Sequence, residues 1–325
     1  MKIKITLNGT DITRDIEPYL KSFSYEDVLS GETDSIDIEL ADRAHLFLSD
    51  WFPPLAATIS VTLIKEKEQI FLGDFELDEI SYAMPPSTIK IKANSCPQKS
   101  ALRQVNQSRA WENCLLSQIA KDIAADADAQ LIYQTEYDPK ISRAEQGSQS
   151  AMNFLEKLCA KYFLSLKFTD NQLVIFETET LEKAETVATL TPENVTHFNA
   201  RSTLSEIYKS CEVSYRHGKK SENFTATAQD KSKTAGKVLK INKKVESVAE
   251  AERLAKNELK QKNKDELKVD VEVRGDFIYS AGMTIQLVNF GVFDGKYLIE
   301  KAKHEVRRGY ECRLELRKTL EGNYD

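Results

Sequence analysis

Four histidines are the first candidates for metal binding or general acid–base chemistry: His45, His197, His217 and His304. No two of them have the spacing that holds a metal ion, and none lies in an H-E-x-x-H sequence. His304 follows an alternating segment at 301–303, which predicts a position on a strand. We therefore favour a structural role for these histidines and predict no metal-binding residue.

Acidic side chains gather near the N-terminus, and a pair of carboxylates can hydrolyse a glycosidic bond. The cluster consists of Glu26, Asp27, Glu32, Asp34 and Asp37. Glu32 and Asp34 follow Ser30 and Gly31, in a turn where Asp side chains commonly stabilise the backbone. We therefore predict no catalytic residue in this cluster.

The five cysteines are scattered along the chain and never stand in C-x-x-C spacing: Cys96, Cys114, Cys159, Cys211 and Cys312. Their odd number and spacing argue against a disulfide framework and a zinc cluster, and favour synthesis in a reducing cytoplasm. Cys159 lies on an apolar helical stripe, so we expect a core residue and not a nucleophile. Walker, G-x-G-x-x-G and G-x-S-x-G sequences are absent, so the chain is predicted to be no enzyme and to hold no cofactor.

Basic side chains in the last third could bind phosphate. They are Arg216, His217, Lys219, Lys220, Lys231, Lys233, Lys237, Lys240, Lys243 and Lys244, with Gly218 among them. Phe224 is the single aromatic residue within this region, so a platform for stacking bases is not supported. A solvated hairpin or a protein-contact surface is the favoured interpretation, and no specific nucleic-acid binding is expected.

Charge is distributed unevenly along the 325 residues, whose net charge is −6. Residues 1–100 have a net charge of −7, residues 101–195 of −5 and residues 196–325 of +6. This pattern excludes a uniformly basic nucleic-acid binder and a uniformly acidic solvating chain. Hydrophobic residues make up 41%, enough for real cores in a chain with room for about two domains. No apolar run resembles a signal peptide or a membrane helix, so we expect no membrane partner.

The segments that must position these residues are mostly strands over 1–100. Polar and apolar residues alternate at 2–7, 35–40, 59–64, 70–72, 75–82 and 88–93, which predicts half-buried strands. The charged turn at 65–68 separates two of them as a hairpin. Many short strands with turn signals indicate a barrel or a sandwich.

Residues 101–190 change to a helical period. Apolar residues from Leu116 to Ala124 predict one helix, with Asn113 as its N-cap. A second helix is predicted from a stripe that starts at Ala151 and ends at Tyr162, capped by Ser148 or Ser150. Alternating segments at 164–168 and 173–176 then form a hairpin. The region is therefore expected to be a small α+β domain.

Residues 191–325 return to strands, interrupted by one helix. Strands are predicted at 207–215, 236–241, 267–273, 284–288, 297–303 and 310–316. Ser247 and Glu250 have the spacing of a capping box, which predicts a helix near 247–264. The expected fold class is thus α+β and mainly β, with domains at 1–100, 101–190 and 191–325.

Two strand-rich segments and a middle region together resemble the late control D, or baseplate hub, family of contractile phage tails. The N-terminal segment is SYEDVLSGETDSIDIELADR at 24–43, followed by WFPP at 51–54. The C-terminal segment runs from Gly282 through GKYLIEKAKH at 295–304 to GYECRLEL at 309–316. The middle region contributes SRAWE at 108–112 and SAMNFL at 150–155. The order and spacing of these pieces, over nearly the whole chain, carry the resemblance.

The resemblance implies a structural hub made of two tail-tube-like β-barrels with an inserted α+β domain. Three subunits would then form a homotrimer with a pseudo-sixfold ring, and the helix near 247–264 would pack outside the second barrel. The implied partners are a tail tube protein on one face, a separate spike protein on the other, and further baseplate components. Such a hub assembles in the bacterial cytoplasm and becomes part of a phage tail or a tail-like particle.

Two alternatives to a hub stay open at this point. A peptidoglycan-binding or wall-degrading tail-associated protein would use the carboxylate cluster and the α+β region. A nucleic-acid-binding protein would use the basic last third. For a ring, the unlike charges of the two ends predict a heterologous and partly electrostatic contact between neighbouring subunits.

Overall fold

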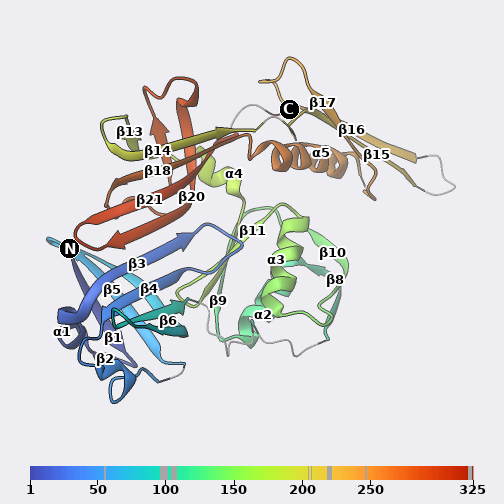
Figure 1. Ribbon diagram of the computed structural model, residues 1–325. Coiled ribbons are helices and arrows are strands. Elements are labelled where there is room, and N and C mark those ends of the chain that lie inside the picture. The colour runs from blue at the N-terminus through green and yellow to red at the C-terminus, as the bar shows by residue number, and fades with distance from the viewer. Residues whose placement is uncertain are drawn as a thin grey trace. The chain divides into compact units, whose positions relative to one another are not determined.

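The computed structural model of the chain describes residues 1–54, 56–95, 102–103, 108–203, 205, 207–217, 222–245, 247–320 and 324. The fold is α+β and mainly β, as predicted, with few helices (Figure 1). The chain forms two compact units. The first unit comprises Met1–Thr178, Val273–Ala281 and Glu300–Leu314, and the second comprises Glu179–Glu272, Gly282–Ile299 and Glu315–Asp325. Whether the regions 1–100, 101–190 and 191–325 are separate domains stays a prediction.

The first unit begins with an antiparallel sheet in the order β3-β4-β7-β6-β5-β1-β2. Its strands are β1 (Lys2–Leu7), β2 (Thr10–Asp11), β3 (Leu20–Val28), β4 (Ser35–Ala41), β5 (Thr58–Lys65), β6 (Glu68–Ala83) and β7 (Thr88–Asn94). Short helical turns lie between them: α1 (Thr13–Ile16), η1 (Glu17–Tyr19) and η2 (Leu46–Leu48). Alternate side chains such as Ile36, Ile38 and Leu40 enter one buried core, because successive residues of a strand face opposite sides.

The prediction of two separate strands at 70–72 and 75–82 is wrong, since β6 is one long strand. The pairing of β5 with β6 shifts its register between Val61 and Thr62, opposite Gly73 and Phe71. Gly73 has a φ of +114°, which a residue with a side chain rarely adopts. The glycine therefore interrupts the apolar alternation locally as a bulge, while the strand continues.

The first unit also contains a helical part with its own hydrophobic core. Its elements are β8 (Ala110–Leu115), α2 (Leu116–Asp126), β9 (Gln130–Gln134), β10 (Lys140–Glu145), α3 (Ala151–Lys161), β11 (Ser165–Thr169) and β12 (Gln172–Phe176). Both predicted helices and the predicted hairpin are present. The Ser150 side chain accepts the N–H of Asn153 at 3.3 Å, which confirms this residue as an N-cap.

The expected N-cap at Asn113 is wrong. Asn113 lies within β8, which pairs with β10, and α2 starts after Leu115. The Gln118 side chain accepts the Leu115 N–H at 2.9 Å, so it satisfies a helix-end donor from within the helix. The strand also pairs Trp111 with Ala144 across the ladder, which places the indole in the core of this part.

The second unit carries a three-stranded sheet in the order β16-β15-β17, against which α5 packs (Figure 1). These elements are β15 (Tyr208–His217), β16 (Glu222–Gln229), β17 (Lys237–Ile241) and α5 (Val248–Asn263). The Ser247 side chain accepts the Glu250 N–H at 3.1 Å, so the predicted cap of α5 is confirmed. Ala251, Leu254 and Leu259 lie on the buried face of the helix.

The remaining elements of the chain are α4 (Thr178–Lys183), β13 (Thr186–Leu190), β14 (Val195–Ser202), β18 (Leu267–Arg274), β19 (Thr284–Leu287), η3 (Gly291–Phe293), β20 (Gly295–Val306) and β21 (Tyr310–Lys318). Strands β18, β20 and β21 each contribute residues to both units. Within the described part of the chain, no helix combines the length and the apolar character that crossing a membrane requires.

Candidate functional site

The structure divides the carboxylate cluster into a buried pair and a peripheral group. Asp27 is the penultimate residue of β3, and Asp34 lies just before β4. Both side chains are nearly inaccessible to solvent. Glu26 and Glu32 lie further out and form ion pairs with Lys301 on β20, at 3.1 and 3.2 Å. Asp37 projects from β4 on its exposed side. Five neighbouring acidic residues of the sequence therefore occupy different environments.

Lys167 of β11 holds the two buried carboxylates together. Its Nζ pairs with Asp27 Oδ1, lies 3.3 Å from Asp34 Oδ1 and donates to the Val28 carbonyl at 2.9 Å. The carboxylates accept backbone donors as well, since Asp27 binds the Ala281 N–H at 2.8 Å and Asp34 binds the Val28 N–H at 3.0 Å. The ammonium group thus connects β11 of the helical part with the end of β3.

The electrostatics of this triad favour a structural role. Burial raises the pKa of Asp34, and the neighbouring Asp27 raises it further, although Lys167 and the Val28 N–H oppose both effects. Burial by itself would lower the pKa of Lys167, but its two carboxylate partners outweigh burial and raise it. A charged lysine between two carboxylates offsets part of their negative charge and engages both of them in ion pairs, as in a structural cluster.

His304 on β20 belongs to a second buried group in the first unit. Its Nδ1 lies 2.8 Å from the Tyr310 hydroxyl and 3.1 Å from Cys312 Sγ, both on β21. Its ring also stacks on Tyr25 of β3, with ring centroids 5.9 Å apart. Burial lowers the pKa of His304 and raises the pKa of Cys312 to about 11. The pair is therefore an uncharged imidazole and a thiol at neutral pH, unlike a nucleophilic cysteine.

The triad and the histidine line one small cavity in the first unit. It has a volume of about 230 Å³, and its walls include Tyr25, Asp27, Asp34, Lys167 and His304, with Phe71 as an apolar neighbour. The spacing of Tyr310 and Cys312 by two residues is a signal in the sequence that both face the same side of a strand. The pairing with His304 was missed because it also needs the hairpin register.

The other histidines make no described contact with this group. His45 has a φ of +55° and its Nδ1 lies 3.0 Å from the Tyr82 hydroxyl. His197 is exposed on β14, and the side chain of His217 lies outside the described residues. Among the residues that the structure describes, no group of three or more His, Cys, Asp and Glu side chains could hold a metal ion.

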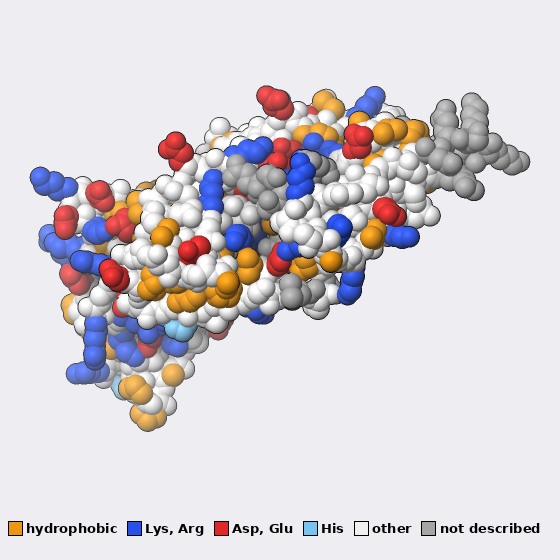
Figure 2. All heavy atoms as spheres, turned by 90° about the horizontal axis from the view of Figure 1, so that it is seen from above, with side chains coloured by type: hydrophobic (Ala, Val, Ile, Leu, Met, Phe, Trp, Pro, Cys, Tyr) orange, Lys and Arg blue, Asp and Glu red, His pale blue; other side chains and the backbone are white. Residues whose placement is uncertain are grey.

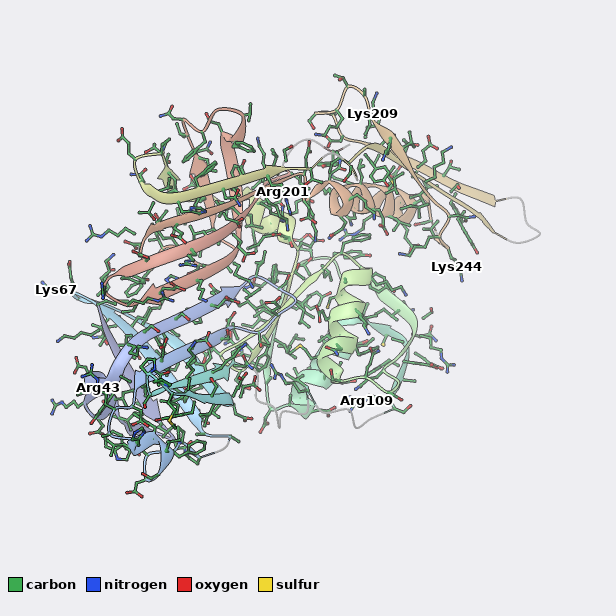
Figure 3. The ribbon with its side chains drawn as sticks, viewed as in Figure 1. Arg43, Lys67, Arg109, Arg201, Lys209 and Lys244 are labelled. Atoms are coloured by element: carbon green, nitrogen blue, oxygen red, sulfur yellow. The ribbon has the colours of Figure 1, made fainter. Side chains whose placement is uncertain are left out.

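Several lysines of the basic region are paired with acidic side chains of the same unit. Lys233 pairs with Glu266, Lys240 lies 3.9 Å from Glu212, and Lys243 lies 3.9 Å from Glu258. Figure 3 shows Lys209 and Lys244 on different sides of the sheet and helix. On the face drawn in Figure 2, basic and acidic side chains are interspersed. The side chains of Arg216, Lys219 and Lys220 lie outside the described residues. The basic side chains of this region that the structure does describe are not concentrated as in a phosphate-binding groove.

The first unit has a further hollow, which the sequence did not predict. An apolar groove of about 430 Å³ lies between the sheet and the segments α1 and η2, with Ile5, Ile12, Ile16, Phe47, Trp51 and Pro53 among its walls. The groove wall is stiffened by edge-on aromatic contacts of Tyr19, Phe47 and Trp51, whose centroids are 5.7 to 5.9 Å apart. Leu48, Trp51 and Phe52 remain substantially exposed beside it. Such an exposed apolar surface is typical of an interaction site.

Residues 90–310 match the family described as phage tail baseplate hub (GPD). No curated protein sequence matches the chain.

Solved structures with a similar fold cover almost the whole chain. The 43 kDa tail protein of a Shewanella oneidensis prophage has a TM-score of 0.76 at 14% identity, over 98% of each chain. A tail protein from Neisseria meningitidis has a TM-score of 0.72 at 12% identity, over 99% of this chain and 98% of that one. A component of the Escherichia coli type VI secretion system has a TM-score of 0.63 at 12% identity, over 99% of this chain and 78% of that one.

Proposed function

Because the chain belongs to the phage tail baseplate hub (GPD) family, we propose that it forms a homotrimeric ring that joins a tail tube to a spike. The proposal rests on one observation: the chain matches both the sequence model of this family and the fold of a phage tail protein. The family covers residues 90–310, and the fold of a prophage tail protein covers 98% of the chain. The function of such a protein lies in its contacts with other subunits.

The ring explains why one chain should have two strand-rich ends. In the proposed arrangement each end supplies one tube-like barrel, so three copies present six similar barrels to a hexameric tube. The opposite face then offers threefold symmetry to a spike. The net charges of −7 over residues 1–100 and +6 over residues 196–325 support alternation of the two ends around the ring.

The buried polar groups support a structural protein over an enzyme. Asp27 and Asp34 are held by Lys167 and by backbone N–H groups, and His304 is buried against two tyrosines and a cysteine. The similarity to a component of the E. coli type VI secretion system supports a place in a contractile machine, with a tube protein and other baseplate components as partners. We place assembly in the bacterial cytoplasm, before the particle is complete.

Electron microscopy of assembled particles tests the proposal. The chain is produced together with a tail tube protein and a spike protein, and a tag on this chain is located by labelled antibody. The hub proposal expects one ring of label at the spike-bearing end of the tube. Label along the whole tube, or a chain that never enters particles, would overturn it.

A parallel assay tests the absence of enzymatic activity. The wild-type protein and the double variant D27N/D34N are incubated with purified peptidoglycan, and released sugar fragments are measured. Neither protein is expected to release fragments above the buffer control. Release by the wild type that the double variant loses would show a wall-degrading enzyme instead.

A further inference from the structure

The second unit has an exposed turn with an apolar side chain at its tip, which could insert into an apolar groove of another protein. The turn is η3, and Val292 at its tip is 84% exposed, more than any other large hydrophobic side chain in the described residues. Val292 therefore buries little of its apolar surface within its own unit. An apolar side chain so exposed on a projecting turn is commonly a contact with another protein.

The turn is rigid before it meets a partner. Asp294 Oδ1 accepts the Phe290 N–H at 2.7 Å, and the Asp294 N–H donates to the Gly291 carbonyl at 3.0 Å. Gly291 has a φ of +67°, which suits glycine in so tight a turn. Below the tip, Phe198 stacks on Phe290 with centroids 4.4 Å apart. A preorganised turn loses little conformational entropy when it binds.

The groove of the first unit offers a matching cavity of about 430 Å³. Its walls are apolar except for Asp15, whose carboxylate is exposed at α1. On the other side of the proposed contact, Lys318 lies beside the turn, because its Nζ donates to the Asp294 carbonyl at 3.1 Å. Lys318 therefore supplies a positive charge beside the turn, next to the Asp294 carboxylate, and Asp15 supplies a negative charge beside the groove, next to Arg14 of α1. These two opposite charges are available in addition to the apolar surfaces.

We propose that the turn at 291–293 of one copy inserts Val292 into the apolar groove of the next copy, with Lys318 facing Asp15. This inference rests on the proposed ring and names the surfaces that close it. A turn and a groove on different units of one chain form a heterologous contact, and such contacts generate closed rings when the rotation between copies permits it. Three identical contacts of this kind would close the trimer.

Disulfide trapping between copies tests the contact. The variants V292C and D15C are prepared separately with tags of different size, mixed, reassembled and oxidised. Because each copy carries one engineered cysteine, a product that contains both tags cannot arise within one chain. The matched control is V238C, which replaces another exposed valine of the second unit, on β17. A mixture of unmodified proteins measures any product of the natural cysteines.

The proposal expects a mixed disulfide from V292C with D15C, at least about tenfold above V238C with D15C, since a single contact geometry favours one pair. Light scattering of the same samples reports the trimer. A trimer with equal trapping of V292C and V238C would overturn the inference and leave the proposed ring standing. A protein that forms no trimer under any condition would contradict the ring and the contact together.

Two charge variants give an independent test. D15K and K318E are each expected to weaken trimer formation, and the combination of both is expected to restore it, because the reversed charges attract again. V292D should weaken association by about 100-fold, since it would bury an unpaired carboxylate in an apolar groove. Weakening by V292D that occurs only in binding to the tube protein would identify the tube as the occupant and overturn the contact between copies.

Discussion

The most informative perturbation of the fold is the removal of the lysine that holds two buried carboxylates. In K167M the stem of the side chain keeps its apolar packing, but Asp27 and Asp34 lose their common cation. The three side chains are only 16%, 9% and 2% exposed, so bulk solvent screens the two carboxylates weakly. The variant therefore leaves two negative charges close together in a buried site.

The magnitude follows from this burial. Removal of one partner from a buried ion pair costs about 3–5 kcal/mol of folding free energy. K301M provides the matched control, because Lys301 also pairs with two carboxylates in the same unit. Its partners Glu26 and Glu32 are 28% and 67% exposed, so solvent screens them and the expected cost is about 0–1 kcal/mol.

Tryptophan fluorescence measures this difference selectively. The two tryptophans of the chain, Trp51 and Trp111, both lie in the first unit, which contains the triad. Urea unfolding followed by their fluorescence therefore reports this unit, and near-UV circular dichroism shows whether the same transition is followed. K167M should lower the midpoint far more than K301M.

A compensating variant separates the charge from the loss of packing. In D27N/D34N/K167M the side-chain amides can still accept the backbone N–H groups of Ala281 and Val28, and no unpaired charge remains. We expect this variant to recover more than half of the loss. If K167M costs no more than K301M, the triad does not contribute in the way its burial indicates, and the reasoning is refuted.

Further outcomes are expected elsewhere in the molecule. Burial lowers the pKa of His304, so its contribution to stability is present above pH 6.5 and is lost as the pH falls through the lowered value; H304N should reduce this loss in urea unfolding. The pKa of Asp34 is raised, so its effect has the opposite sign. Its contribution to folding stability is present below pH 3.8 and is lost as the pH rises through the raised pKa. S247A removes the cap of α5 and should cost about 1 kcal/mol, seen as faster hydrogen exchange in that helix. R317M leaves Glu182 buried without its 2.6 Å partner and should make the second unit sensitive to limited proteolysis. K240M removes an exposed partner of Glu212 in the same unit and should not have this effect. High salt should promote dissociation of the trimer, measured by light scattering, because the proposed contact joins regions of opposite charge.

The spacing of apolar residues along the sequence correctly predicted those strands and helices whose apolar side is also the side that the fold buries. Strands β1, β4 and β7 alternate because one face of each is buried, and α3 has a continuous apolar stripe with a capping serine. The parallel pairing of β9 with β12 was not predictable from either segment alone. It joins residues about 40 positions apart, and only the packing of α2 and α3 brings them together.

The same limit applies to the polar groups. The acidic cluster was visible in the sequence, but its cation Lys167 lies 140 residues away from Asp27 and looks like any polar residue of an alternating strand. His304 and Cys312 are only eight residues apart, yet their contact depends on how β20 and β21 are paired. The apolar groove forms only when α1 and η2 pack over the sheet, so no local sequence pattern predicts it.

The mass of the assembled protein tests the central claim most directly. Light scattering coupled to size-exclusion chromatography measures it without reference to shape. The account predicts a single species of three 36.9 kDa chains, about 111 kDa, whose images show a ring with near-sixfold density. A stable 36.9 kDa monomer at all concentrations, with and without the tube and spike proteins, would contradict it.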